Sequence, residues 1–358
     1  MRRQAVSFPH FQFSFICPMQ KRKLFMPRFK EIIKMCLPYG FVEYLKDGYI
    51  SAYFASKKIF EKYYAPKYGK NTFPLKEKTA KRIIYMADGR QRACGLADRL
   101  RGIVSLYKIS KELNVDFKIN MTSPVDLSNY LVPNKYNWII DENEIVYNIK
   151  ESVIYDFWDQ TAEHFAFQTI KSMLKKWNQM HITTNMCIAD KEYGELFNEL
   201  FKSSHELQGK IDCCLSEIGC DFISVTFRFQ ELLGDFLEEC GPAVLPDAER
   251  IVLIRRCIDH LMEIYKENNY KKILVTSDSI TFLNKAKEFD FVYVIPGKIA
   301  HIDHHLMFEK EVYMKSFLDY FLLTYSKMAY LVVDGQMYNS EFAYRAALHN
   351  LPYKIKRY

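Results

Sequence analysis

The chain has 358 residues, more than one hydrophobic core normally organises, so its length predicts two domains. Apolar residues make up 49% of the sequence, which is ample for a packed globular protein, and no apolar run reaches the length of about 18 residues that a membrane-spanning helix needs. The nine cysteines follow neither a disulfide nor a zinc spacing, and we therefore expect a reduced, cytoplasmic protein.

The net charge of +7 is unevenly distributed along the chain. Residues 1–82 carry 18 Lys and Arg against 5 Asp and Glu, whereas the remainder carries 32 against 38. The basic character therefore belongs to an N-terminal extension, predicted to be mostly helical over residues 1–80, and not to the catalytic body. Prolines break any signal-type apolar stretch near the start, and Met26 is an alternative start of the native protein.

Residues 27–64 carry a helical pattern of aromatic and aliphatic side chains interleaved with lysines. A basic amphipathic segment of this kind either lies on an anionic membrane surface at the inner face of the plasma membrane or packs on its own domain with lysines outward. Both interpretations stay open. Nucleic acid is not expected as a partner, because the basic stretch is not coupled to a recognised nucleic-acid-binding motif.

A strand, a loop and a helix are predicted in succession over residues 81–107. The strand covers residues 83–86, the loop holds two glycines and two arginines, and apolar residues at helical spacing follow from Leu96 to Tyr107. Gly89 and Gly95 free the backbone to approach a ligand, and the helix start presents unpaired N–H groups, so phosphate or sugar can bind here. An ordinary turn with solvated arginines explains the pattern equally well.

The rest of the first domain, residues 81–205, alternates between strands and helices, which predicts a mainly parallel sheet covered on both faces. Strands are predicted at 117–119, 138–140, 144–147 and 181–187, and helices at 165–177 and 193–215.

The second domain, residues 206–358, alternates in the same way. Strands are predicted at 222–229, 272–276, 292–295 and 330–333, and helices at 246–268, 280–289, 317–325 and 340–349. Asp247 is expected to cap the first helix, whose buried face is predicted to hold Ile251, Ile254, Ile258, Leu261 and Ile264. Two α/β units of similar size predict a cleft between them, with the ligand at strand ends.

Arg228 is the strongest candidate for ligand binding. It lies in the apolar run of residues 222–229, where an unpaired charge is expensive to bury. The side chain therefore pairs with a carboxylate, for which Asp235 is the candidate, or faces a ligand. An arginine fork suits a diphosphate.

Two further strand ends carry polar side chains. Asp278 and Ser279 follow residues 272–276, where they accept from a ribose or base, or cap the next helix with nothing bound. Ser340 follows residues 330–333 and places donors on a phosphate, or belongs to a capping box in which Asn339 fits better.

A histidine cluster offers a metal site on composition alone. It comprises His301, Asp303, His304 and His305 but lacks the H-E-x-x-H helical geometry, and no Asp-x-Asp signature occurs in the chain. We interpret these side chains as part of a solvated loop, and no metal site is expected.

These motifs, in this order, resemble the GDP-fucose-dependent fucosyltransferases, which include the α1,2-, α1,6-, protein O- and nodulation enzymes. Residues 95–102 resemble the first loop of that family. The later signatures are matched by Thr226-Phe227-Arg228 with a displaced Gly234-Asp235, by Thr276-Ser277-Asp278, and by Asn339-Ser340-Glu341-Phe342. Thr226 stands where the family has a histidine.

The resemblance implies a GT-B fold, in which two Rossmann-like domains face a cleft and the C-terminal one holds the donor without a metal or other cofactor. It implies that Arg228 binds the diphosphate and stabilises the leaving GDP. The nucleotide sugar would also meet Thr226, Asp278, Ser279, Ser340 and Phe342 from the C-terminal domain, and Gly95, Asp98 and Arg99 from the N-terminal domain.

The expected reaction is inverting transfer of fucose to a glycan acceptor of bacterial surface polysaccharide or lipopolysaccharide, a lipid-linked glycan included. Asp98 and Asp88 are candidates for the general base by position only. Two alternatives stay open: a GT-B transferase for another nucleotide sugar, and a non-catalytic nucleotide-sugar-binding subunit that docks a biosynthetic complex through its basic helices.

Overall fold

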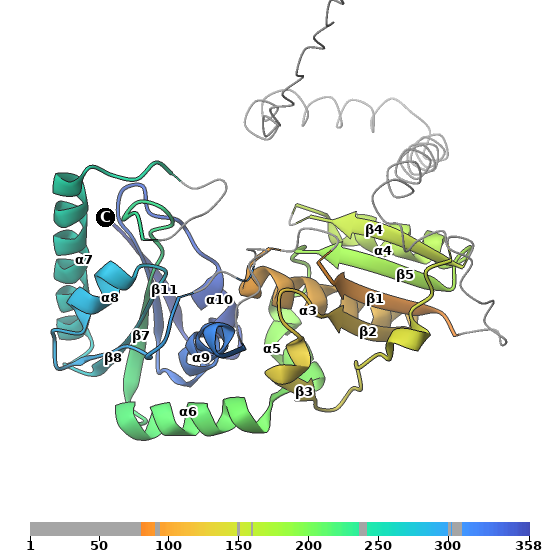
Figure 1. Ribbon diagram of the computed structural model, residues 1–358, viewed down its shortest axis with the longest axis horizontal. Helices are drawn as coiled ribbons and strands as arrows, with labels where there is room; N and C mark the ends of the chain where they lie inside the picture. The colour runs from red at the N-terminus through yellow and green to blue at the C-terminus, as the bar shows by residue number, and fades with distance from the viewer. Residues whose placement is uncertain are drawn as a thin grey trace, which may run out of the picture. The chain divides into compact units, whose positions relative to one another are not determined.

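A computed structural model describes residues 80–89, 94–148, 151–158, 160–235, 242–299, 302 and 310–358 (Figure 1). All of these residues belong to one compact unit, Gly69–Tyr358. Several predictions lie outside the described residues: the basic N-terminal extension, the two loop arginines at 90 and 92, and the histidines at 301, 304 and 305.

The first sheet is parallel, in the order β2-β1-β5-β4. Helix α3 (Leu96–Leu113) connects β1 to β2, and α4 (Glu163–Met173) connects β4 to β5. The strands are β1 (Arg82–Ala87), β2 (Asp116–Met121), β4 (Ser152–Phe157) and β5 (Gln179–Thr184). Five of the six residues of β1 are buried, because this strand is paired on both sides and packs against α3. The loop predicted after the first strand begins at the carboxyl end of β1.

The second sheet is also parallel, in the order β11-β10-β7-β8-β9. Figure 1 labels its strands β7, β8 and β11. Its strands are β7 (Phe222–Phe227), β8 (Lys272–Ser277), β9 (Val292–Tyr293), β10 (Ala329–Val333) and β11 (Tyr353–Arg357), and its helices are α7 (Asp247–Glu267), α8 (Ile280–Ala286), α9 (Lys310–Tyr325) and α10 (Phe342–Ala347). The chain runs outward from β7 through β8 to β9, then returns to the other side of β7 for β10 and β11. The order therefore reverses between β7 and β10, and such a switch point is where doubly wound sheets bind ligands.

We call the sheet β2-β1-β5-β4 with its helices the first α/β unit and the sheet β11-β10-β7-β8-β9 with its helices the second; both confirm the predicted α/β class with parallel sheets. Between them along the chain lie α5 (Tyr193–Leu200), β6 (Phe201–Ser203) and α6 (His205–Ile218). Strand β6 pairs antiparallel with β3 (Leu131–Pro133), which lies between β2 and β4 along the chain in the first unit. The boundary expected after residue 205 falls at the start of α6 and stays a prediction. Among the described helices, none combines the length and the apolarity that crossing a membrane requires.

Several predicted elements were wrong. The strand predicted at 144–147 is absent: a short 3₁₀ helix, Glu142–Glu144, stands there, and the strand that extends the sheet is β4. The strand predicted at 138–140 is reduced to a single bridge between Ile139 and Ile119. The helix predicted over 193–215 is interrupted by β6, after which the Ser204 hydroxyl accepts from the Leu207 N–H at 3.3 Å and starts a new helix.

The buried face of α7 differs from the prediction at its first turns. Ile251 is 60% exposed, and Leu253 is buried instead, together with Cys257, Leu261 and Ile264. The residue before the helix, in the capping position, is Pro246, and Asp247 is the first helical residue. The apolar pattern of this segment is broad enough to fit two faces, and packing against the sheet selects one of them.

Candidate functional site

Arg228 directly follows β7, at the point where the strand order reverses. Its Nη1 lies 3.1 Å from Oδ2 of Asp278, which directly follows β8. The salt bridge to Asp235 that the sequence offered as the alternative was therefore wrong, because another carboxylate pairs with this arginine. The guanidinium is fixed at the carboxyl edge of the sheet, with the arginine side chain 17% exposed.

Asp278 is held from the main chain as well. Its two carboxylate oxygens accept the backbone N–H groups of Phe229 at 2.8 Å and Gln230 at 2.7 Å. Burial raises the pKa of the Asp278 carboxyl, while Arg228 and these two N–H groups oppose the rise. One carboxylate thus fixes both the side chain of Arg228 and the turn that follows it.

Thr226 lies inside the second sheet. Its Oγ1 is 2.8 Å from Oγ1 of Thr276, its partner across the β7–β8 pair, and the residue is only 4% exposed. The two hydroxyls satisfy each other in the sheet interior, which explains why a small polar residue is tolerated in the strand.

Ser279 is the N-cap of α8, as the helix-capping interpretation predicted. Its hydroxyl accepts from the Phe282 N–H at 3.1 Å and donates to Asp235 at 2.8 Å. Asp235 also accepts the N–H of Thr281 at 2.7 Å. Asp235 therefore joins the segment after β7 to the start of α8. Its negative charge is favourable there, because the N-terminal end of the helix dipole is positive.

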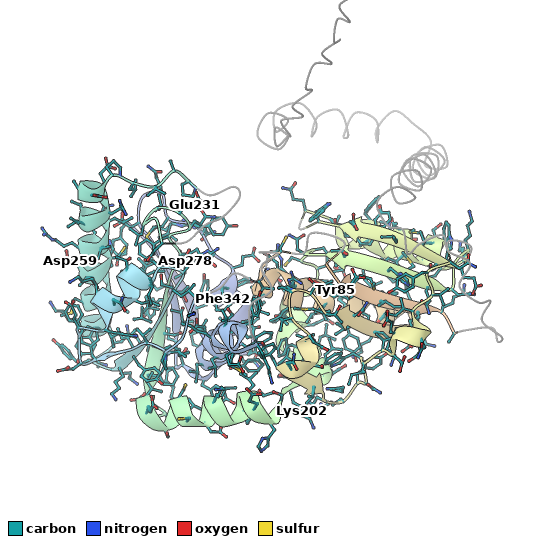
Figure 2. All side chains as sticks on the ribbon, viewed as in Figure 1. Tyr85, Lys202, Glu231, Asp259, Asp278 and Phe342 are labelled. Carbon is teal, nitrogen blue, oxygen red and sulfur yellow. The ribbon has the colours of Figure 1, made fainter. Side chains whose placement is uncertain are left out.

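Ser340 lies in the segment between β10 and α10, and Phe342 is the first residue of α10. The Ser340 hydroxyl accepts the Phe342 N–H at 3.2 Å, and the Phe342 ring meets Tyr320 edge-on at 5.7 Å between centroids. The capping position itself is taken by Glu341, whose side chain makes no cap. Figure 2 labels Asp278 and Phe342, which lie in the same α/β unit.

The segment between β10 and α10 is bound to the main chain of Arg228. The Tyr338 N–H donates to the Arg228 carbonyl at 3.0 Å. The structure thus brings together the ends of β7 and β8 and the segment that precedes α10, where Tyr338 lies 110 positions after Arg228 in the sequence.

The predicted residues of the first unit lie at the start of α3. Gly95 is its N-cap, and Asp98 accepts from Arg101 at 2.9 Å. Arg99 is buried and donates to three carbonyl oxygens, which belong to Cys94 (2.7 Å), Ser123 (2.9 Å) and Ile302 (3.3 Å). Arg99 thereby ties together three backbone segments, one of them from the second half of the chain.

An ion-pair network built on two buried arginines, which the sequence did not reveal, connects the two α/β units. Oε2 of Glu341 accepts from Arg101 at 2.6 Å and from Arg345 at 2.6 Å. Arg345 is 1% exposed and also binds Asp190 and, at 2.8 Å, the sulfur of Cys187. We call these five residues the Glu341 network.

The charges of the Glu341 network are mutually stabilised. Burial disfavours the ionised carboxyl of Glu341, but hydrogen bonds and charges from Arg345 and Arg101 outweigh it and lower its pKa. Burial likewise opposes ionisation of Asp190, and contacts with Cys187 and Arg345 lower its pKa below the ordinary value. The only sequence signal for this network was the presence of Arg101 and Arg345 among small and apolar residues of two helices.

Within the part of the chain that the structure describes, no group of three His, Cys, Asp or Glu side chains is arranged to hold a metal ion.

Neither a protein-family model nor a curated protein matches the sequence. Three solved structures to which the chain is similar are fucosyltransferase NodZ from Bradyrhizobium (15% identity, 75% of this chain and 93% of that one, TM-score 0.48), a mutant of Arabidopsis thaliana FUT1 in complex with GDP (12%, 85% and 79%, 0.49), and POFUT1 in complex with GDP (8%, 78% and 99%, 0.45). The solved structures similar to this chain thus include fucosyltransferases, the group that its motifs resemble.

Proposed function

We propose that the chain is a glycosyltransferase that transfers fucose from GDP-fucose to a glycan acceptor. One observation carries the proposal: Arg228 is fixed by buried Asp278 beside the switch point of a doubly wound sheet, where nucleotide ligands bind in such folds. The order of the sequence motifs supports the same donor, because all four fall on strand ends or helix starts.

In this proposal Arg228 neutralises the negative charge that develops on the departing diphosphate. The guanidinium is held before the reaction starts, so little reorganisation is needed when charge develops. The turn containing Ser340 and Phe342 would meet the phosphates and sugar, while Asp278 and Ser279 hold the edge of the nucleotide pocket in place. Thr226 lies beneath that edge.

The first unit would bind the acceptor. Gly95, Asp98 and Arg99 stand at the start of α3, and Asp98 is the proposed general base for the acceptor hydroxyl. The transfer is proposed to invert the anomeric carbon without a metal. We place residues 81–205 on the acceptor side and residues 206–358 on the donor side.

The proposed setting is bacterial surface polysaccharide synthesis in the cytoplasm, with residues 27–64 on the inner face of the plasma membrane. Deleting residues 1–70 should abolish sedimentation with anionic phosphatidylglycerol vesicles at low salt, because basic residues supply the attraction. Equal sedimentation of the truncated and full-length chains would refute the membrane contact.

Thermal unfolding with GDP, UDP, CDP and ADP tests the donor proposal. A ligand that binds only the folded state raises its apparent stability by mass action. We expect the midpoint to rise with GDP for the wild type and for Arg255→Ala, an exposed arginine on α7. The rise should be absent for Arg228→Ala and reduced for Arg228→Lys, because Lys keeps the charge but loses the fork.

The other outcomes separate the alternatives. A preference for UDP or CDP would keep the binding site and replace the sugar donor, a result that the threonine at position 226 permits. A GDP response without hydrolysis of GDP-fucose or transfer of its sugar would favour a non-catalytic binding subunit. Absence of any response would overturn the nucleotide-sugar proposal.

A further inference from the structure

The segment between β10 and α10 is anchored firmly at its start. Asp334 is 4% exposed and its carboxylate binds Arg256 of α7 through two contacts, at 2.7 and 3.0 Å. His260, one turn further along α7, lies 2.8 Å from the same carboxylate. Three residues on, Met337 is buried in the core with its sulfur 3.7 Å from that of Cys257. The chain therefore leaves β10 along a fixed path.

Tyr338 follows immediately and its backbone is fixed on both sides. Its N–H donates to the Arg228 carbonyl at 3.0 Å, and its own carbonyl accepts from the Ser340 N–H at 2.9 Å. In spite of these anchors the residue is 51% exposed. The fold thus presents at the protein surface an aromatic residue whose main chain is bound to that of the arginine of the candidate site.

We infer that the ring of Tyr338 is the surface on which the nucleobase of the donor stacks. The inference rests on the proposed function, because it requires a nucleoside diphosphate at Arg228. The main chain of Tyr338 is bound to that of Arg228 at the switch point of the sheet, so its exposed ring belongs to the same edge at which a diphosphate would meet the guanidinium.

Stacking also explains how the nucleobase can be bound although Thr226 stands where the fucosyltransferases have a histidine. The hydroxyl of Thr226 is engaged by Thr276 in the sheet, at 2.8 Å. Aromatic stacking needs no hydrogen-bond donor from this position, because every base offers a π-face. Tyr338 should therefore contribute affinity for all nucleoside diphosphates while leaving the order of preference among them unchanged.

Titration calorimetry with GDP and with UDP tests the inference on the full chain. Replacing Tyr338 by Ala should weaken binding of each nucleotide roughly 5- to 100-fold, the range that loss of a base stack produces. Tyr338→Phe should stay within about twofold of the wild type, because its ring is retained, whereas Tyr338→Leu should fall close to the alanine variant.

Tyr325→Ala is the matched control. Tyr325 is 45% exposed and is the last residue of α9, at the opposite edge of the same sheet. We expect this variant to bind both nucleotides as the wild type does. Thermal unfolding without ligand checks that the variants fold, and pyrophosphate, which has no base, should bind the wild type and Tyr338→Ala equally.

The outcomes separate failure of the inference from failure of the proposed function. If the wild type binds neither nucleotide, the proposed function fails and the inference with it. If GDP binds, Arg228→Ala loses it and Tyr338→Ala does not, only the stacking inference is overturned. Weaker binding of GDP-fucose with unchanged binding of GDP would place the ring against the sugar and would also overturn it.

Discussion

Asp278 is the residue on which the geometry of Arg228 depends. It lies 5% exposed beneath the turn after β7 and binds both the arginine and two backbone N–H groups. An uncompensated change at such a buried charge pair is costly, because the remaining partner loses its counter-charge in a poorly solvated place.

The first prediction concerns this carboxylate. Asp278→Asn should lower the free energy of unfolding by about 3 kcal/mol and weaken GDP binding, because Arg228 loses its charged partner and the amide cannot accept both N–H groups. Urea unfolding measures the first effect and calorimetry the second. Asp247→Asn, whose side chain is 86% exposed, is the control and should change neither. Equal unfolding curves for Asp278→Asn and wild type would contradict the interpretation.

His349 supplies a second prediction at the residue scale, on pH. Its ring packs edge-on against Phe197 at 4.8 Å, and burial lowers its pKa from 6.5 to about 4. Between these values the unfolded chain binds a proton that the folded chain does not, so stability falls as the pH drops from about 6.5 toward 4, by up to about 3 kcal/mol.

The measurement is urea unfolding at a series of pH values. His349→Gln should flatten the dependence in this window, whereas His164→Gln, at an exposed position, should leave it intact. A slope unchanged in His349→Gln would show that other groups carry the pH dependence.

At the scale of elements, the contact between α3 and β5 is exceptionally close. A Cβ built on Gly102 would lie 2.1 Å from the carbonyl oxygen of Thr184. Because this neighbour is backbone, it cannot swing aside, and the helix must move away from the end of the strand to admit a methyl group.

The third prediction compares two glycines within helices. Gly102→Ala should destabilise the fold by about 2 kcal/mol or more through overpacking, whereas Gly209→Ala on α6, where nothing lies within 4 Å, should stabilise it by about 0.5–1 kcal/mol. Both effects appear as shifts in the urea midpoint. Stabilisation by Gly102→Ala would mean that α3 sits further from the sheet than described.

The elements that the sequence predicted well are those with a long or continuous apolar pattern. Helix α3 and strands β1, β7 and β8 fall close to the predicted ranges because their periodicity leaves one choice. Strand β11 was missed because lysines alternate along an edge strand that is half exposed. The break between α5 and α6 was missed because it depends on pairing of β6 with β3, a distant segment.

The candidate site, like the fold, was predictable from the sequence only in part. An arginine in an apolar strand identified Arg228, since burial of a lone charge demands a partner or ligand. The identity of that partner was not predictable, because Asp278 and Asp235 both follow in the sequence and only the strand register places Asp278 beside it. The proposed role of Tyr338 depends likewise on a backbone contact between the segments that follow two strands, β7 and β10.

At the scale of the whole molecule, the Glu341 network joins the two α/β units. The carboxylate of Glu341 bonds Arg101 of α3 and Arg345 of α10 through the same oxygen. Arg345 in turn reaches Asp190, in the segment after β5. Loss of the shared carboxylate leaves each of the two buried arginines with a single carboxylate partner among the described contacts, Asp98 for Arg101 and Asp190 for Arg345.

The fourth prediction is therefore that Glu341→Gln lowers the free energy of unfolding by about 1.5 kcal/mol, because both arginines are buried but the Glu341 side chain is 46% exposed. A double-mutant cycle with Arg101→Met measures how much of this belongs to the contact between the units, and the coupling should exceed about 0.5 kcal/mol. Glu288→Gln removes an exposed ion pair with Lys285 and should cost almost nothing. Additive effects of the first two substitutions would show that the units are held together by other contacts.

The position of Glu341 between Ser340 and Phe342 has a thermodynamic consequence. The same short turn faces the proposed donor site and bonds the helix that opens the proposed acceptor domain. Two equilibria that share a turn are linked, and linkage is reciprocal. If donor binding strengthens the contact between α3 and α10 by a given free energy, then formation of that contact strengthens donor binding by the same free energy.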